Sequence, residues 1–329
     1  MIRGLLKREV FILKKKVFAF LFCIALCSQF FFSEEYSVFR KDGLYGIINE
    51  DRKVVFQHNY DWITINPNSI VCSIDFEVEI YNKLLKLVFS DTQVNIKYYS
   101  ENDILITKAM TGEKRLLNVK TAEITNFKGN ENYLEEYGYR DNLELVWKKD
   151  TVGALYSIVN SKGSVILTDI KQAYFCYTNG MIALVLKDGT SGFVNREGKM
   201  VIETSFYIEP SDNGPRKYPI IRYFFNENYA LVKNNEQKWV QYDIEGNEKP
   251  FPGNIEPATY CYINGLVPVL DKQTKKYGYM NPELQIVIPC EFDSAEAFDG
   301  KYAIVEKDGK DAVIDKEGNI YYCDEFNKK

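Results

Sequence analysis

Side chains able to perform acid–base or metal chemistry are sparse in this chain. Its 329 residues contain one histidine, His58. When the repeated segments described below are aligned, His58 takes the place of Cys290 and Thr204, which indicates a structural position. No His-x-x-x-His, Cys-x-x-Cys, Gly-x-Ser-x-Gly or glycine-rich phosphate loop occurs. We therefore expect no catalytic residue, no metal site and no cofactor.

Carboxylates are abundant but poorly placed for catalysis. The adjacent pairs Glu34-Glu35 and Glu135-Glu136 lie in polar, loop-like segments, where charge is normally solvated. The stretch Asp315-Lys316-Glu317-Gly318 superficially resembles a calcium loop, but it lacks the fixed series of oxygen ligands that calcium requires. We interpret it as a turn.

Of the seven cysteines, Cys23 and Cys27 lie in the N-terminal segment. The others are Cys72, Cys176, Cys261, Cys290 and Cys323. Their odd number and wide separation follow no disulfide pattern. Cys176 and Cys261 lie between aromatic residues, so each is expected to be a buried free thiol. An oxidising compartment would permit a bridge, but the sequence does not pair them.

A recurring polar position is the strongest pattern in the chain. An Asn or Asp follows a short apolar run, and most copies have Gly two or three residues later. Asn and Asp bond their own backbone in tight turns, and Gly tolerates positive φ, so Asn-x-x-Gly between apolar runs predicts a hairpin loop. The positions are Asn49, Asn82, Asn118, Asn160, Asn195, Asp243, Asn281 and Asp315.

The elements that carry these turns are short strands. In the last unit, Ala303-Ile304-Val305-Glu306, Ala312-Val313-Ile314 and Ile320-Tyr321-Tyr322 are predicted strands separated by turns. The expected fold is all-β, a tandem array of about eight three-stranded antiparallel meanders. Because one unit cannot bury its own faces, neighbours must stack. A β-propeller-like ring is favoured, and an open β-solenoid is the alternative.

These residues resemble the WG-repeat proteins of bacteria. The resemblance rests on an aromatic-Gly pair such as Tyr45-Gly46 or Tyr277-Gly278, on the strand Ile286 to Pro289, and on Lys-Asp-Gly turns. Those turns are Lys41-Asp42-Gly43, Lys187-Asp188-Gly189 and Lys307-Asp308-Gly309. The resemblance covers roughly residues 37 to 325, and it is weak in the units around Asn82 and Asn118. It implies a repeat array without catalytic residues.

Charge and composition narrow the choice of partners. The chain carries 41 basic and 46 acidic residues, and its first 32 residues hold six of the basic ones and Glu9. The remainder is therefore net −10, which repels phosphates and makes nucleic acid an unexpected partner. Aromatic residues make up 15% of the chain. We expect most of them to pack between units, with an exposed aromatic binding surface as the alternative.

The N-terminus predicts export. A basic start with Lys14, Lys15 and Lys16 precedes an uncharged run from Val17 to Phe32, as in a secretory signal. We assign residues 1–33 to a signal peptide or N-terminal membrane anchor, and residues 34–329 to the repeat domain. Lipidation at Cys23 or Cys27 is a third option. The repeat domain is expected outside the cytoplasm, touching a membrane only through the N-terminal segment.

The function predicted from these features is that of an exported, non-enzymatic binding or scaffold protein whose repeat-built surface meets a protein or glycan of the cell envelope or exterior. Loops on repeat arrays often carry such roles. The insert Ile208 to Pro219 is the candidate binding loop, with a disordered insertion of no consequence as the alternative. Its candidate residues are Pro210, Asp212, Asn213, Pro215 and Tyr218. The rival function is a carboxylate-dependent glycan hydrolase, which would need two acids roughly 5–10 Å apart in one cleft.

Overall fold

The computed structural model describes residues 36–98, 102–127, 143–148, 155–160, 163–178, 181–206 and 225–326. Within these ranges every regular element is a β-strand except one short 3-10 helix, η1 (Cys323–Glu325). The prediction of an all-β fold is therefore confirmed. The expected leader, residues 1–33, and the candidate loop, residues 208–219, lie outside the described residues. Among the described residues no helix is long and apolar enough to cross a membrane.

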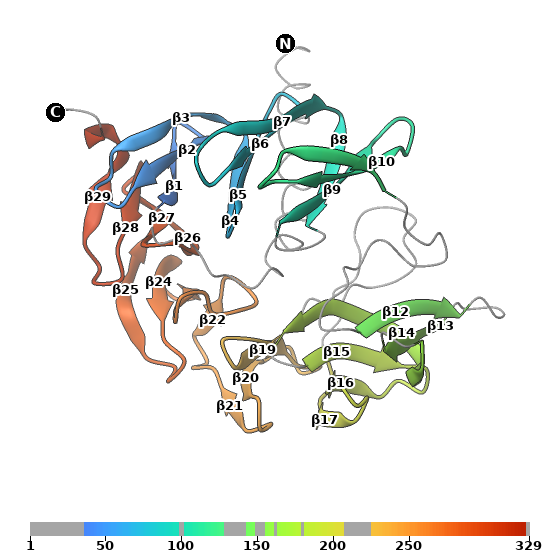
Figure 1. Ribbon diagram of the computed structural model, residues 1–329. Helices are drawn as coiled ribbons and strands as arrows, with labels where there is room; N and C mark the ends of the chain where they lie inside the picture. Colours follow the sequence, from blue (N-terminus) through green and yellow to red (C-terminus); the bar gives the residue numbers. More distant parts are fainter. Residues whose placement is uncertain are drawn as a thin grey trace, which may run out of the picture.

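The strands form antiparallel sheets that follow one another around a ring, as a seven-bladed β-propeller (Figure 1). The first sheet contains β1 (Tyr36–Lys41), β2 (Leu44–Asn49) and β3 (Val54–Tyr60). The second contains β4 (Trp62–Asn66), β5 (Ser69–Ile74), β6 (Glu77–Asn82) and β7 (Leu87–Thr92). The third contains β8 (Val94–Tyr98), β9 (Asp103–Lys108), β10 (Lys114–Asn118) and β11 (Glu123–Asn126).

The fourth sheet has six strands in chain order. They are β12 (Leu143–Lys148), β13 (Leu155–Asn160), β14 (Val165–Thr178), β15 (Met181–Leu186), β16 (Ser191–Val194) and β17 (Met200–Glu203). The fifth contains β18 (Phe225–Asn226), β19 (Tyr229–Lys233), β20 (Trp239–Asp243) and β21 (Glu248–Pro250). The sixth contains β22 (Ile255–Pro257), β23 (Val267–Asp271), β24 (Lys276–Met280) and β25 (Ile286–Phe292). The seventh contains β26 (Ser294–Asp299), β27 (Tyr302–Lys307), β28 (Lys310–Ile314) and β29 (Ile320–Tyr322).

The expected count of about eight three-stranded units is close but not exact, because five of the seven sheets in the described residues have four strands. In the four-stranded sheets, the strand missed by the prediction is the first and innermost one. Segments such as β26, Ser294–Asp299, are rich in Ala, Glu and Asp, which have low β propensity. In addition, β14 runs for 14 residues without a break and joins two predicted units, those of Asn160 and Asn195, in one sheet.

The first and last sheets lie side by side (Figure 1). Phe39, Ile48, Tyr302 and Val313 share one buried cluster. Above it, the Arg52 guanidinium lies 3.9 Å from the centre of the Tyr321 ring and donates to the Tyr302 hydroxyl at 3.0 Å. The solenoid alternative is wrong, since it would hold the two end sheets apart.

The Asn and Asp positions act as predicted from their turn chemistry. Asn49 Oδ1 accepts from the backbone N–H groups of Asp51 at 3.1 Å and Lys53 at 2.9 Å. Asp243 Oδ1 does the same for its own turn, from Glu245 and Asn247. The remaining members of the set also accept backbone N–H groups of their own turns. These turns therefore close hairpins between consecutive strands, such as β2 and β3 or β20 and β21.

The glycine of the aromatic-Gly pair is required because a larger residue would collide with the neighbouring strand. A Cβ at Gly278, on β24, would lie 2.5 Å from the Ile288 carbonyl oxygen and 2.8 Å from the Cys290 nitrogen, and one at Gly46 would lie 2.6 Å from the Phe56 oxygen. The register between β24 and β25 shifts at Gly278, and the register between β2 and β3 shifts at Gly46. The outer strand thus bulges directly over the glycine, where only a missing side chain leaves room.

The core lies between neighbouring sheets. One buried cluster joins Ala183 and Phe193 to Ala230 and Val240 of the next sheet. Another joins Tyr279 and the sixth sheet to the seventh. The largest fully buried side chains are aromatic, namely Tyr262, Tyr279, Tyr302, Phe39, Phe193, Phe292 and Phe298. The expected packing role of the aromatic residues is confirmed for this group.

We predict that Gly278→Ala lowers the free energy of unfolding by roughly 1–3 kcal/mol, because the new methyl group must displace the backbone of the outer strand. Gly253→Ala is the matched control, since a Cβ there meets nothing within 4 Å and the residue has no positive φ. Urea unfolding of both variants measures the difference. Equal stability of the two variants would contradict the steric explanation.

Candidate binding rim

The innermost strands of three sheets end in a polar residue at equivalent places. Asn66 ends β4, Asn226 ends β18 and Asp299 ends β26. Each is paired with the first residue of the following strand across a two-residue turn. We call the turns after these innermost strands, together with the residues that flank them, the inner rim.

Side chains of the inner rim bond to the next sheet around the ring. Asn66 Nδ2 donates to the Tyr98 hydroxyl of the third sheet, and Asn226 Nδ2 donates to the Tyr262 carbonyl at 2.6 Å. The backbone N–H of Val38 on β1 donates to the Asp299 carboxyl. These contacts have a structural role, because they tie successive sheets together at the inner edge of the ring.

Neighbouring turn residues extend this pattern. Asn68 Nδ2 donates to Asn102 Oδ1 at 2.9 Å. The backbone N–H of Gly265 donates to Glu227 Oε2 at 2.7 Å. The inner rim therefore presents amide and carboxylate groups on turns from several sheets.

Two side-chain oxygens of the inner rim take no part in these hydrogen bonds. Asn66 Oδ1 and Asp299 Oδ1 are buried and have no hydrogen-bond partner among the described residues. Asn66 is only 5% exposed. Ser157 Oγ, on β13, is the third such atom in the described ranges and lies away from these turns. A buried acceptor without a donor costs free energy, and here two such acceptors lie at equivalent turns of the inner rim.

Asp299 is also electrostatically unusual. Burial, together with the nearby Glu296 carboxylate, raises the pKa of Asp299 to about 7, although the hydrogen bond from Val38 lowers it. A carboxyl with a strongly raised pKa is common at functional sites. Near neutral pH this group can therefore accept or donate a hydrogen bond.

The neighbouring carboxylates are held by Arg40 of the first sheet. Its guanidinium lies 2.9 Å from Asp311, 3.4 Å from Glu296 and 3.6 Å from Glu306. Burial raises the pKa of Glu296 and the Arg40 charge opposes that rise. Since Glu296 is committed to this ion pair, we assign the Arg40 cluster to closure of the ring.

The residues considered from the sequence for chemistry have structural surroundings. His58 lies on β3 with its ring centre 6.1 Å from that of Phe39. Asp315 bonds its own turn and the Tyr321 hydroxyl, as a turn residue should. No group of three potential metal ligands occurs among the described residues.

Four cysteines are described as free thiols. Cys72, Cys261 and Cys323 are buried and Cys290 is partly buried, so the expectation of a buried free thiol is confirmed for Cys261. The side chain of Cys176 lies outside the described residues, as do Cys23 and Cys27.

The binding residues expected from the sequence lie outside the described residues. They are Pro210, Asp212, Asn213, Pro215 and Tyr218. Sequence reasoning missed Asn66 and Asp299 of the rim. The available signal was the polar residue followed by Pro-Asn or Gly-Lys at a tight turn, which alone does not distinguish a rim from any surface hairpin.

The repeat itself is matched by a known family. The model of the WG containing repeat matches residues 45–68 and 277–310. The chain contains WG repeats. The first match begins in β2 and the second in β24, and each continues into the next sheet. The WG repeat is thus offset from the sheet, and its glycine is the one beneath the bulge. No curated protein matches the chain significantly.

Solved structures with similar folds have low sequence identity. AztD from Citrobacter koseri, in its apo form, is 11% identical, with a TM-score of 0.44 over 87% of this chain and 95% of that one. BamB from Moraxella catarrhalis is 10% identical, with a TM-score of 0.37 over 90% and 98% of the two chains. Hsv2p from Kluyveromyces lactis is 9% identical, with a TM-score of 0.39 over 78% and 94%. The fold assignment rests on the sheets themselves.

We predict that Asp299→Asn changes the pH dependence of stability. The pKa of Asp299 in the folded chain, about 7, exceeds that of an unfolded aspartate, about 3.9. The folded state therefore binds the proton more tightly, and the contribution of this carboxyl to stability falls as the pH rises from about 4 to 7. The variant should lack this fall, which is on the order of 4 kcal/mol for a difference of about three pKa units. Thermal and urea unfolding between pH 4 and 8 measures it.

Asp315→Asn is the control with the opposite sign. Burial raises the pKa of Asp315, but hydrogen bonds from Asn319 and Tyr321 outweigh it and hold the pKa below the usual range. Its contribution to stability is therefore lost as the pH falls through the acid range. If Asp299→Asn and wild type show parallel pH profiles, the electrostatic description of the rim is wrong.

Proposed function

We propose that the chain is an exported, non-enzymatic binding or scaffold protein of the cell envelope or exterior. The observation that carries the proposal is the pair of buried oxygens, Asn66 Oδ1 and Asp299 Oδ1, left without donors at equivalent turns of the inner rim. The fold supplies rigid sheets behind these turns, which favours recognition of a ligand over a role in packing alone.

The rim chemistry suits a ligand that brings hydrogen-bond donors. Hydroxyl groups of a glycan or backbone N–H groups of an extended peptide are donors of this kind. Amide groups such as that of Asn68 can also donate or accept at the edge of the rim. A protein or glycan partner therefore fits better than nucleic acid, whose phosphates bring acceptors and negative charge.

Export is part of the proposal. It rests on the basic and then apolar start of the sequence, so fractionation of the producing cells is its test. Full-length protein recovered in the cytosol would contradict it.

Binding is tested by pull-down from the cell-envelope fraction, with the recovered material analysed for protein and for carbohydrate. We expect Asn66→Ala and Asp299→Asn to reduce recovery of one component roughly tenfold, the loss typical of a buried hydrogen-bonded contact. Gln273→Ala, at an exposed turn between β23 and β24, is the matched control. Deletion of residues 208–219 tests whether the candidate loop contributes.

The outcomes separate the possible results. Loss in both rim variants, with circular dichroism unchanged, supports the rim as the binding site. Equal recovery from wild type, both rim variants and the control variant would refute it. Loss only in the loop deletion would place the contact on the insert instead.

A glycan hydrolase is the second candidate, favoured by one observation. Because the pKa of Asp299 is about 7, this carboxyl could act as a general acid near neutral pH. Glu296, its nearest named carboxylate, is held by Arg40 at 3.4 Å, which leaves the pair poorly suited to the second role. Release of reducing ends from envelope glycans by wild type, abolished in Asp299→Asn, would favour the hydrolase.

A further inference from the structure

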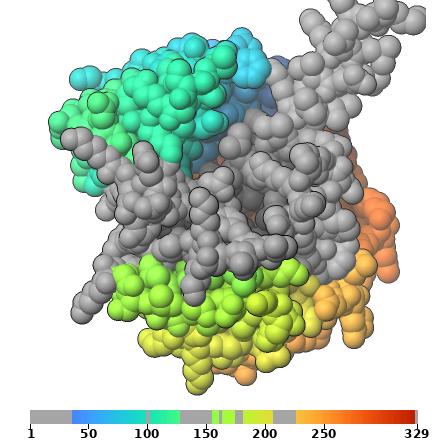
Figure 2. Space-filling model, turned by 90° about the vertical axis from the view of Figure 1, so that its right-hand side faces the viewer, coloured from blue at the N-terminus to red at the C-terminus, as the bar shows by residue number. Residues whose placement is uncertain are grey.

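Two apolar side chains stand exposed on neighbouring sheets, at the opposite end of the strands from the inner rim. Phe76, in the turn between β5 and β6, is 69% exposed, and Met110, in the turn between β9 and β10, is 83% exposed. The second and third sheets form one continuous surface in Figure 2, coloured cyan to teal. Apolar tips on adjoining sheets can therefore act together.

Backbone hydrogen bonds connect these two turns. The N–H of Gln93, between β7 and β8, donates to the Phe76 carbonyl at 3.1 Å. The N–H of Ala109 donates to the Gln93 carbonyl at 2.9 Å. The Phe76 turn and the Met110 turn are thus tied to each other through Gln93, and their relative position is fixed.

The corresponding turns of other sheets have polar tips. Where the structure describes them, they are Asp42-Gly43, Asp188-Gly189, Asn235-Glu236, Gln273-Thr274 and Asp308-Gly309. The two apolar tips belong to the units around Asn82 and Asn118, where the WG pattern is weakest. Both turns therefore differ from the polar pattern of the other units in the same way.

The backbone conformation at Phe76 disfavours a bulky side chain. Asp75 and Phe76 have φ of 46° and 69°, so both central residues of this two-residue hairpin are left-handed, a turn that prefers Asn and Gly. A bulky side chain there costs free energy. Since the ring is also 69% exposed, its burial in the folded chain offsets only part of that cost.

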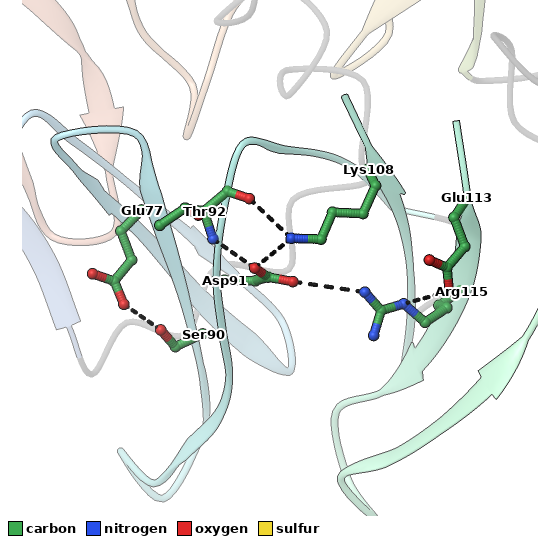
Figure 3. A network of polar contacts seen from close by, with 7 residues as sticks. All are labelled: Glu77, Ser90, Asp91, Thr92, Lys108, Glu113 and Arg115. Carbon is green, nitrogen blue, oxygen red and sulfur yellow. Dashed lines mark hydrogen bonds and ion pairs between the residues drawn. The ribbon is translucent and has the colours of Figure 1, made fainter. Parts of the chain in front are cut away.

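The strands and turns next to the two apolar tips carry charged groups, several of which are drawn in Figure 3. Asp91 binds the Lys108 ammonium at 2.6 Å and lies 3.6 Å from Arg115, which also meets Glu113 at 3.5 Å. Glu77 accepts from the Ser90 hydroxyl. The Asp75 N–H donates to the Asp61 carboxylate at 3.1 Å.

The balance of these charges is acidic. The carboxylates of Asp61, Asp75, Glu77, Asp91 and Glu113 outnumber the cations of Lys108, Lys114 and Arg115 by two. Two copies meeting through this surface would bring acidic rims together, and anionic lipid headgroups would be repelled. A protein partner with a basic surface would complement the acidic groups around Phe76 and Met110.

We propose that the tips of the second and third sheets, Phe76 and Met110 with their acidic rim, dock a protein whose surface offers an apolar pocket bordered by Lys and Arg. An apolar centre inside a polar rim is the usual anatomy of a protein interface. This surface is separate from the inner rim, so the two can bind different partners.

The test uses the full chain in the cells that produce it. A photo-crosslinking amino acid, benzoylphenylalanine, replaces Met110, and a matched site is Asp188 at the equivalent polar turn. We expect one protein to be cross-linked from position 110 and not from 188. Cross-links to a second copy, to lipid, to nothing, or equally from both positions would overturn the proposal.

The cross-linked protein is then purified and titrated with the chain. We expect Phe76→Asn and Met110→Ser each to weaken binding roughly tenfold, and binding to weaken as salt is raised. Asn suits the left-handed turn, so Phe76→Asn should melt at the same temperature as wild type or higher. Undiminished binding by Phe76→Asn would refute the docking surface. Sedimentation with phosphatidylglycerol vesicles would support a membrane contact instead and equally refute it.

Discussion

The structure depends on one constraint, which is that no sheet of short strands can bury its faces alone. Each of these buried clusters therefore contains side chains from two neighbouring sheets. Phe193 packs with Val240 in one cluster, and Tyr279 packs with Val305 in another. The sheets form a ring because only ring closure covers the face of the first sheet that the second sheet leaves open. Arg40, Arg52 and Phe39 of that sheet all meet the last one.

Much of this could be predicted from the sequence because it is local chemistry. Asn49 and Asp243 form turns because their side chains accept hydrogen bonds from the adjacent backbone. The regular spacing of such residues in the sequence is enough to predict these turns. The innermost strands could not be predicted so readily. β26 reads as a polar segment, and β18 has only two residues. They become strands because a neighbouring strand supplies their hydrogen bonds, a tertiary effect that propensity does not contain.

The candidate binding rim was harder still to predict. Asn66 and Asp299 are distinguished by what surrounds them, namely the loss of solvent and the contact with the next sheet. Neither property is written in the residue type. The insert from Ile208 to Pro219 stood out in the sequence because it broke the spacing, whereas the rim residues keep the spacing. Phe76 lies between these cases, since an aromatic in a tight turn is visible in the sequence but its exposure is not.

Closure by the two ends also sets the order of events during synthesis. Arg52 and Tyr302 are 250 residues apart in the chain, so the first sheet leaves the ribosome long before its last neighbour. At about 5–20 residues per second, that interval is on the order of 10–50 seconds. Throughout it, the apolar face around Phe39 has no partner and is open to aggregation. A chaperone, or passage through an export channel before folding, would therefore serve this protein more than one whose contacts are local.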